Sequence, residues 1–554
     1  MDLVSTLLAI WMLLVYSVSG TGLRTSSARL LKPQVGALAN ADQTQVDVPA
    51  RTAPPLPPTF TDGIVADGPQ PDGPFVSRAA TKYRAYPEFD NIMPISVTTP
   101  ASGTAPGYVF LANMGIFGIY NPAIFILENN GEPLFLRQLP LTSPPKVLAD
   151  FKKRTVNGQD RLTYFFGDAP NPAWANGRAY ALDQTYSQIE EWNIGNGYEA
   201  SGADLHDFQL MPNGSAVLLS YVSVPYDLSP FGGPVSGTVV DMVIQEQDAA
   251  HNVVFEWRGL QHIPLTDSYA VLSSTTPLDY IHTNAIEPDS DGNLLVSNRN
   301  TSQIIKIDRS TGNVLWRLGG KSNEFDLNGD TGFAFQHDIR RLPNGNITVF
   351  DNGNLHNPRA SRQLEYEIDE VNKVVTRTWQ FPDDNSRYTY IMGNAQRLPN
   401  GNTIGSWAVL NKVTEVMPNG TLALELGLGE WTYRAFRDTW EATPSESPRL
   451  VALRGSDPTT ATLYFGWNGA TDVLSYSIYA GPTLTSTTLV TTTMRTGFET
   501  SLALSDLPAD TCVYQVRPRR ATGPSLPLSN AVYRMEAPAC LAQLKFTYMP
   551  VVMR

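Results

Sequence analysis

The sequence predicts an all-β protein, a large β-propeller followed by a small β-sandwich. From about residue 75 to residue 442 the chain reads as short alternating strands separated by Gly and Asn turns, without an amphipathic segment of helix length. A strand–turn–strand unit recurs there, and its turns at Asp291-Gly, Asn344-Gly and Asn400-Gly lie 53 and 56 residues apart. Asn-Gly and Asp-Gly favour tight hairpins, and strand repeats of this length are typical of propeller blades, so we expect a six-bladed β-propeller.

The first 74 residues are expected to lie outside the folded domains. Leu3 to Val18 is an apolar stretch followed by small residues, so residues 1–20 read as a signal peptide. Because Asp2 stands where a basic residue is usual, an uncleaved anchor is the alternative. Residues 21–74 are rich in Ala, Thr, Pro and Gly, which predicts a Pro-rich linker or arm. Without a later apolar run of about 18 residues, we expect no stable membrane span after cleavage, and a secreted, extracellular protein.

The repeat ends after the propeller (residues 75–442), and residues 448–534 hold alternating strands of another kind. A strand that ends at Trp467 precedes a Leu507-Pro-Ala-Asp-Thr-Cys-Val-Tyr514 segment. A core tryptophan followed by this pattern, over about 90 residues, favours a fibronectin-III-like sandwich. Such a module usually spaces or presents other domains, and we expect no catalysis from it. Residues 535–554 form a tail.

Two covalent features are expected of an exported chain. Cys512 and Cys540 are the only cysteines in the sequence, and we expect them to form a disulfide that clamps the tail onto the last domain. Four Asn-x-Ser/Thr sequons are candidate glycosylation sites, and they begin at Asn213, Asn300, Asn346 and Asn419.

The composition narrows the classes of function. A chain of 554 residues with 42% hydrophobic and 17% charged residues is typical of a folded protein of more than one domain. The net charge of −13 and the lack of a basic run argue against a nucleic-acid partner, because phosphate binding needs clustered Lys and Arg. The sequence also lacks a phosphate-binding glycine loop, a serine nucleophile elbow and Cys-His metal spacing.

Three of the six histidines open the same strand in different copies of the repeat. His206 and His337 each lie seven residues before the Asn of their turn, and His282 lies nine before its Asp. Equivalent positions in blades lie at equivalent places around the propeller axis, so the three imidazoles are expected to converge. A packing role in each blade is the alternative, but the fourth copy has Gly393 at this position, so the fold does not require a histidine there.

Arg299 is expected to join the histidines. It follows the Asp-Gly-Asn turn on the returning strand, seventeen residues after His282, which brings it back to the same end of the same blade. A guanidinium with three imidazoles suits a tetrahedral oxyanion, because it offers forked donors to several oxygens. The other histidines match no repeat position, and we expect surface or loop roles for them: His251, His262 and His356.

The quoted motifs resemble those of the arylsulfotransferase family, most closely its eukaryotic branch. The resemblance is specific from about residue 200 to 360 and weaker across the rest of the propeller. It rests on six segments: Asp279-Tyr-Ile-His-Thr-Asn284, Asp291-Gly-Asn-Leu-Leu-Val-Ser-Asn-Arg299, Ile304-Ile-Lys-Ile-Asp308, Trp316-Arg-Leu-Gly-Gly320, Gln336-His-Asp and Val349-Phe-Asp-Asn-Gly353. It implies that His337 is transiently sulfated while His282, Arg299 and His206 hold the sulfuryl oxygens, with Asn284 beside them. The implied reaction is ping-pong transfer from a small phenolic sulfate ester to a phenol, with no metal or organic cofactor.

Two departures from the bacterial enzymes affect the expected substrate more than the chemistry. The N-terminal sandwich domain of those enzymes and their disulfide in the propeller have no counterpart here. Asp207 and Asp338, each next to a key histidine, are candidates to orient an imidazole ring.

Two other functions remain open from the sequence. A hairpin from Asp308 to Trp316 also occurs in quinone-cofactor dehydrogenases, although adjacent cysteines and a good calcium site are missing. The third hypothesis for the function is a non-catalytic secreted propeller that binds glycans or proteins. The sequence does not indicate an oligomeric state.

Overall fold

The computed structural model describes residues 82–169, 173–454, 457, 459–534 and Cys540. The predicted signal peptide (1–20), the arm (21–74) and all of the tail except Cys540 lie outside the described residues. The predicted all-β fold is confirmed, since the only described helices are single turns. They are η1 (Ser229–Phe231), α2 (Gly259–His262), η2 (Leu265–Asp267), η3 (Ala408–Leu410) and η4 (Leu484–Ser486). None of the described helices has the length and apolar character needed to cross a membrane.

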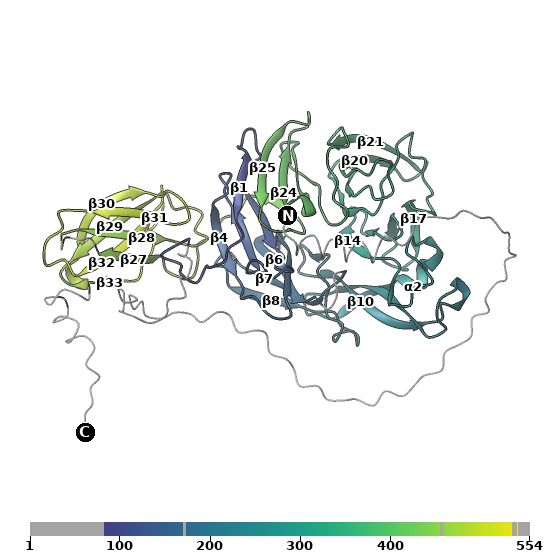
Figure 1. Cartoon of the computed structure of the whole chain (residues 1–554), viewed down its shortest axis with the longest axis horizontal. Coiled ribbons are helices and arrows are strands. Elements are labelled where there is room, and N and C mark those ends of the chain that lie inside the picture. The colour runs from purple at the N-terminus through teal and green to yellow at the C-terminus, as the bar shows by residue number, and fades with distance from the viewer. Residues whose placement is uncertain (1–81, 170–172, 455–456, 458, 535–539, 541–554) are drawn as a thin grey trace, which may run out of the picture. The chain divides into compact units, whose positions relative to one another are not determined.

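Six sheets follow one another between Ile95 and Asp438 in the described part of the chain (Figure 1). The first three, in spatial order, are β26 (Ala435–Asp438), β2 (Tyr108–Asn113), β3 (Ala123–Leu127) and β4 (Pro133–Gln138); then β5 (Lys146–Val156), β6 (Gln159–Asp168), β7 (Asn176–Leu182) and β8 (Gln188–Trp192); then β9 (Phe208–Leu210), β10 (Ala216–Tyr226), β11 (Gly237–Gln247) and β12 (Val253–Arg258). Neighbouring strands in these sheets are antiparallel, and β13 (Leu278–Asp279) adds a short parallel pair to β11.

The other three sheets continue the pattern. They are β14 (Thr283–Pro288), β15 (Leu294–Asn298), β16 (Gln303–Ile307) and β17 (Val314–Gly319); then β18 (His337–Arg341), β19 (Ile347–Asp351), β20 (Arg362–Asp369) and β21 (Val374–Phe381); then β22 (Gln396–Arg397), β23 (Thr403–Ser406), β24 (Lys412–Val416), β25 (Leu422–Leu428) and β1 (Ile95–Thr99). Two sheets therefore join strands from both ends of the region, because β1 pairs with β25 and β26 pairs with β2.

The hairpin turns on which the repeat was recognised share one backbone geometry. The turn glycine in each copy has a φ between +84° and +91°, and its N–H donates to the carbonyl three residues earlier at 2.9–3.0 Å. Glycine reaches this left-handed conformation without the steric penalty of a Cβ. The four glycines are Gly214, Gly292, Gly345 and Gly401.

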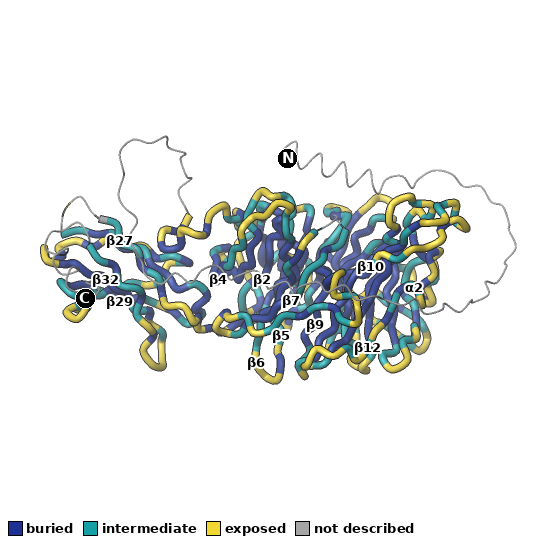
Figure 2. Tube along the Cα trace, turned by 90° about the horizontal axis from the view of Figure 1, so that it is seen from below, coloured by how far each residue is buried: buried dark blue, intermediate teal, exposed yellow. Residues whose placement is uncertain are grey.

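The apolar cores lie between sheets that are consecutive along the chain. Each consecutive pair of sheets shares a cluster of buried residues, and the sheet that holds β22 to β25 packs in turn on the sheet that holds β2 to β4. Trp316, which ends the hairpin that begins at Asp308, is buried in one such cluster and donates its indole N–H to Glu370 at 2.9 Å. In Figure 2 the strands are mostly dark blue or teal, and the exposed residues, in yellow, lie mainly at turns.

The first strands of consecutive sheets are joined by side chains. These leading strands are β26, β5, β9, β14, β18 and β22. At each step an Asp, Asn or Arg side chain bonds to the next leading strand or to a residue directly before it. The bonds are Asp150 Oδ2 to Phe208 N (3.4 Å), Asp207 Oδ2 to Ile286 N (3.0 Å), Asn284 Nδ2 to Gln336 O (2.7 Å), Asp338 Oδ2 to Ala395 N (3.0 Å), Asn394 Oδ1 to Ala435 N (3.0 Å) and Arg434 to Asp150 Oδ1 (3.0 Å).

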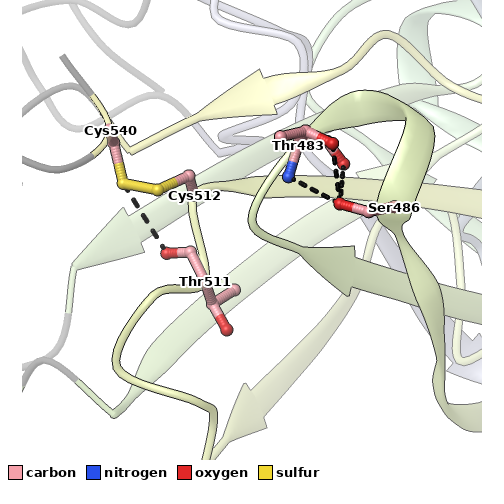
Figure 3. The surroundings of a disulfide bond; sticks show 5 residues. All are labelled: Thr483, Ser486, Thr511, Cys512 and Cys540. Carbon is pink, nitrogen blue, oxygen red and sulfur yellow. Dashed lines mark hydrogen bonds between the residues drawn. A yellow bond between two sulfur atoms is a disulfide. The ribbon is translucent and has the colours of Figure 1, made fainter. Parts of the chain in front are cut away.

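Two further antiparallel sheets form the C-terminal part. One is β27 (Arg449–Arg454), β28 (Ala461–Gly466) and β31 (Thr500–Leu504), and the other is β30 (Thr488–Met494), β29 (Ser475–Gly481), β32 (Val513–Arg519) and β33 (Val532–Tyr533). Their facing side chains share one buried cluster that contains Trp467, Leu507 and Tyr514. Cys512, beside β32, forms a disulfide with Cys540, with 5.4 Å between the Cα atoms (Figure 3).

Candidate active site

The three repeat histidines lie at the same end of three neighbouring leading strands. His206 precedes β9 by two residues, His282 directly precedes β14, and His337 opens β18. All three are buried, and the His206 and His282 rings meet edge to face with centroids 4.8 Å apart. The Tyr433 ring lies 5.5 Å from His206 and 6.5 Å from His337. The structure therefore brings these histidines together, and we call them the imidazole cluster.

The backbone around the imidazole cluster adopts conformations that side-chain-bearing residues rarely take. His282, Phe335, Asp338 and Met392 have φ values of +49°, +56°, +58° and +62°. The pairing of β18 with β19 also shifts register between His337 and Arg340. Such left-handed residues and bulges re-aim side chains and gather at functional sites.

Each imidazole has its Nδ1 atom held, but the partners differ. Asp204 contacts His206 Nδ1 and Asp279 contacts His282 Nδ1, both through carboxylate oxygens at 2.5 Å. The partner of His337 is the neutral side chain of Asn352, whose Oδ1 lies 2.7 Å from Nδ1. A carboxylate favours a charged ring, whereas an amide oxygen holds a neutral one without adding charge.

The charge state of the imidazole cluster follows from burial. Burial lowers the pKa of His337 well below its usual value, and the positive charge of Arg299 lowers it further, against the bond to Asn352. Burial also lowers the pKa of His282, with Asp279 opposing this and Arg299 adding to it. His337 is therefore a neutral base at neutral pH. Its Nε2 accepts a hydrogen bond from the backbone N–H of Met392 at 3.2 Å.

Arg299 lies beside the imidazole cluster. Its backbone N–H donates to the carbonyl of His282 at 2.9 Å, so the end of β15 is tied to the start of β14. The buried guanidinium donates to Asn300 Oδ1 at 2.8 Å and to the carbonyl of Tyr390 at 3.2 Å. It also lies 4.8 Å from the centre of the Phe335 ring. These contacts fix a positive charge close enough to His282 and His337 to lower the pKa of both.

Asn284 is the second residue of β14, two residues after His282, and its side chain reaches the residue directly before β18. Its Nδ2 donates to the carbonyl of Gln336, and its own carbonyl accepts from Tyr433 at 3.1 Å and from Arg434 at 2.8 Å. Its Oδ1 is buried and has no hydrogen-bond partner among the residues that the structure describes. Asn284 thus fixes the spacing of two leading strands and keeps one acceptor uncommitted.

The sequence-based interpretation that Asp207 and Asp338 orient the imidazole rings is wrong. Asp207 contacts Lys152 at 2.9 Å and Arg340 at 3.0 Å, and Asp338 contacts Arg340 at 2.8 Å. Burial acts to raise the pKa of Asp207, but Arg340, Lys152 and Arg434 outweigh it and hold the pKa well below its usual value. Neighbours in a strand point to opposite faces, which directs these carboxylates away from the rings.

These carboxylates belong instead to a buried ionic network that runs beneath Asn284. Arg434 has no exposed surface and lies within 3.0–3.3 Å of Asp150, Asp207 and Asp338. The residues that do orient the rings were missed from the sequence. Asp204 and Asp279 had a local signal, since they precede their histidines by two and three residues.

The remaining histidines lie apart from the imidazole cluster. His251 stacks on Trp192 and His262 on Trp257, with ring centroids 3.8 Å and 5.0 Å apart. His356 Nε2 contacts Asp351 at 2.8 Å.

One of the four sequons cannot serve as a glycosylation site in the folded protein, which corrects the sequence-based expectation. Asn300 is buried, its Nδ2 donates to the carbonyl of Asp279 at 2.8 Å and its Oδ1 binds Arg299. A glycan needs this nitrogen free and exposed. Asn213 and Asn419 are exposed in turns, and Asn346 is half-buried with its Nδ2 on Glu365.

Comparison with known proteins assigns the family. The family model for arylsulfotransferase (ASST) matches residues 152–429, half of the chain and the part that holds the imidazole cluster. The protein therefore belongs to the arylsulfotransferase family, as the sequence motifs predicted. This membership points to an arylsulfotransferase activity on small-molecule substrates.

Other comparisons are distant. No curated protein matches the chain. Among solved structures, a protein of unknown function from Bacteroides caccae is 11% identical with a TM-score of 0.34, covering 58% of this chain and 93% of its own. A catalytically inactive virginiamycin B lyase from Staphylococcus aureus is 11% identical with a TM-score of 0.32, covering 68% and 97%. A streptogramin B lyase is 12% identical with a TM-score of 0.33, covering 62% and 98%. These likenesses are too weak to support a conclusion about this chain.

Proposed function

We propose that this protein is a secreted aryl sulfotransferase that moves a sulfuryl group from a phenolic sulfate ester to a phenol through a sulfohistidine at His337. The observation that carries the proposal is the difference between the three imidazoles. His337 is neutral and has an unprotonated Nε2, whereas its two neighbours are held by carboxylates. A nucleophile needs a lone pair, and anion-binding groups need protons.

The first half-reaction forms the covalent intermediate. The Nε2 lone pair attacks sulfur, the bond between sulfur and the aryl oxygen breaks, and a phenolate leaves. Met392 N–H, 3.2 Å from Nε2 before attack, then becomes available to an oxygen of the transferred group. The developing charge on the sulfuryl oxygens is held by the fixed guanidinium of Arg299 and by the imidazoles of His282 and His206.

The second half-reaction restores the enzyme. The oxygen of an acceptor phenol attacks sulfur, the bond between sulfur and His337 breaks, and the imidazole returns to its neutral form. The phenolic proton passes to His282 or His206, each of which has a carboxylate on Nδ1 to stabilise the imidazolium that results. The imidazolium then gives this proton to the phenolate that left in the first half-reaction, or to solvent. Asn284, with its uncommitted Oδ1, lies where it can orient a substrate hydroxyl.

We also propose that the six sheets are the blades of a β-propeller and that the C-terminal sheets form a fibronectin-III-like sandwich. The side-chain bonds that link the leading strands in order, and return from Arg434 to Asp150, support a closed ring around a common axis. The imidazole cluster then lies at one end of that axis. Secretion is supported by the apolar N-terminal stretch and by the disulfide between Cys512 and Cys540, since disulfides persist in oxidising compartments.

The test is sulfuryl transfer by the purified full chain. We expect nitrophenolate release from p-nitrophenyl sulfate that depends on added phenol and yields phenyl sulfate, and we expect its loss in His337→Ala. His251→Ala is the matched control, because this histidine stacks on Trp192 away from the site. Donor labelled with radioactive sulfur and added without acceptor should label wild-type protein and leave His337→Ala unlabelled.

Two results would count against the proposal. Release that does not need phenol would indicate a sulfatase. No release from any of a panel of aryl sulfates, with no labelling of His337, would favour a binding protein.

A further inference from the structure

The side chain of Asn352 makes three hydrogen bonds in the candidate active site. It follows β19 directly, is fully buried, and its Oδ1 lies 2.7 Å from His337 Nδ1. Its Nδ2 donates to the carbonyls of Thr389 at 2.8 Å and Met392 at 2.9 Å. One amide therefore contacts both the candidate nucleophile and the loop whose backbone N–H reaches the other side of the same ring.

The orientation of this amide leaves no choice of tautomer for His337. A flipped amide would set its oxygen against two carbonyl oxygens and give up two hydrogen bonds, so Nδ2 must face the loop. Oδ1 then faces His337, and an oxygen can only accept, so Nδ1 carries the proton. The backbone N–H of Met392 can only donate, so Nε2 carries the lone pair.

We propose that Asn352 is the positioning residue that holds His337 in the neutral Nδ1–H tautomer and keeps its Nε2 ready to attack sulfur. The catalytic half of this statement rests on the proposed sulfotransferase function, whereas the tautomer does not. In water a free imidazole prefers the opposite tautomer, with its proton on Nε2, which has no lone pair to offer. Asn352 thereby converts an inactive form of His337 into the active one.

The choice of an amide over a carboxylate also separates the roles of the three rings. The charged and titratable side chains that face His337 are Arg299, His282 and His206, and Tyr433 lies across its ring. None of these groups favours the positively charged form of His337. A carboxylate at position 352 would supply the missing negative charge and make His337 resemble His282, which holds its Nδ1 against Asp279.

The loop from Thr389 to Met392 is held in place independently of the imidazole. Ser361 Oγ contacts the Thr389 carbonyl at 3.1 Å and accepts from the Thr389 N–H at 2.9 Å. Asn354 Nδ2 donates to the Tyr390 carbonyl at 3.1 Å. Asn354 is thus a matched control, because it binds the same loop through the same kind of group and is not among the contacts of His337.

The tautomer can be tested in the wild-type full chain without a variant. Nitrogen-15 NMR of protein labelled at histidine distinguishes a protonated from a bare ring nitrogen, and the signals of His337 are those lost in His337→Gln. We expect a protonated Nδ1 and a bare Nε2 at pH 8, persisting below the usual histidine pKa of 6.5. A proton on Nε2 at pH 8 would overturn the inference.

Variants at position 352 test whether the Asn352 amide sets the tautomer of His337. Asn352→Leu removes both the acceptor of the Nδ1 proton and the donor that holds the Met392 carbonyl, so neither side of the ring still fixes the tautomer. We expect the proton to move toward Nε2 and kcat to fall roughly 10²- to 10⁴-fold, with a smaller change in KM, since general-base and nucleophile positioning has effects of this size. Asn352→Asp should protonate His337 and shift the acid limb of the kcat profile to higher pH, so that activity recovers as the pH rises. Asn354→Leu should leave the tautomer unchanged.

The outcomes separate this inference from the proposed function. If the wild type has the expected tautomer and Asn352→Leu changes it, the positioning role stands even where no aryl sulfate is turned over, and only the proposed function fails. If Asn352→Leu keeps the tautomer, or Asn354→Leu disturbs it equally, the positioning role is refuted even in an active enzyme.

Discussion

Arg434 is expected to be one of the most sensitive positions in the protein, although it touches no substrate. It has no exposed surface, contacts Asp150 at 3.0 Å and lies 3.3 Å from Asp207 and 3.2 Å from Asp338. It also holds the carbonyl of Asn284 at 2.8 Å. Arg434→Met keeps most of the side-chain volume and removes the charge and the donors. The variant therefore leaves three buried carboxylates with one cation fewer.

The magnitude follows from what remains in the network. Removing one partner of a buried ion pair costs about 3–5 kcal/mol, because a desolvated charge is left uncompensated. Asp150 keeps Lys152 and Asp338 keeps Arg340, at 2.5 Å and 2.8 Å. We therefore expect a loss of about 3–4 kcal/mol at pH 7, in the lower part of that range.

The pH dependence of this loss has a definite sign. The pKa of Asp207 is held well below 3.8, so its ionised form stabilises the fold above that pH and this contribution fades as the pH falls through the depressed pKa. With Arg434 gone, the pKa of Asp207 moves up and part of the contribution is lost. The deficit of the variant should be full at pH 7 and shrink below about pH 4.

The measurement is urea unfolding of full-length Arg434→Met, followed by tryptophan fluorescence at pH 7 and pH 3. Lys82→Met is the control, because Lys82 lies 3.6 Å from Glu132 with both side chains largely exposed. Exposed pairs contribute about 0–1 kcal/mol, so the control should unfold close to the wild type. The reasoning fails if Arg434→Met loses no more stability than the control, or if its deficit grows on acidification.

Three further outcomes follow from the contacts. Binding of an aryl sulfate should draw a proton onto His282, whose pKa is lowered by burial in the free site and raised by a bound anion. Calorimetry in buffers of different ionisation enthalpy would detect this uptake at pH 7, and equal uptake in Asp279→Asn would contradict the role of that carboxylate. In a glycosylating host, Asn419→Gln should remove a glycan while Asn300→Gln changes no carbohydrate mass, and a glycopeptide at Asn300 would disprove its burial. Cys512→Ser opens a loop with a sequence separation of 28 residues and should destabilise the C-terminal sheets by about 3–4 kcal/mol, because the disulfide restricts the unfolded chain. An unchanged melting temperature would contradict this account of the disulfide.

The fold was predictable where local chemistry repeats. The turn glycines, such as Gly345 and Gly401, need a left-handed backbone, and the sequence shows them at a regular spacing in front of apolar strands. The tryptophan hairpin was ambiguous for the same local reason. Trp316 packs one sheet on the next. A tryptophan with this packing role can occur in strand repeats of different families, so it does not identify the family.

For the site, the sequence predicted which residues converge but not which side chains hold the imidazole rings. The repeat placed His206, His282 and His337 at equivalent positions. Residues at equivalent repeat positions have equivalent backbone positions in the folded protein. The ring partners depend on side-chain direction at bulged strand starts, which is why Asp279 was overlooked and Asp207 was misread. Asn300 failed as a sequon for a related reason, because burial is decided by neighbours distant in sequence.

What the sequence by itself determined about this protein is its all-β class, its family and the set of residues at the site, since each depends on local spacing and residue type. The tertiary structure alone decided the chemical state of those residues. Asn352 comes fifteen residues after His337 and Met392 another forty later, yet they hold opposite nitrogens of one ring. Burial and a nearby guanidinium then set the charge of that ring, and both are sums over groups that only folding brings together.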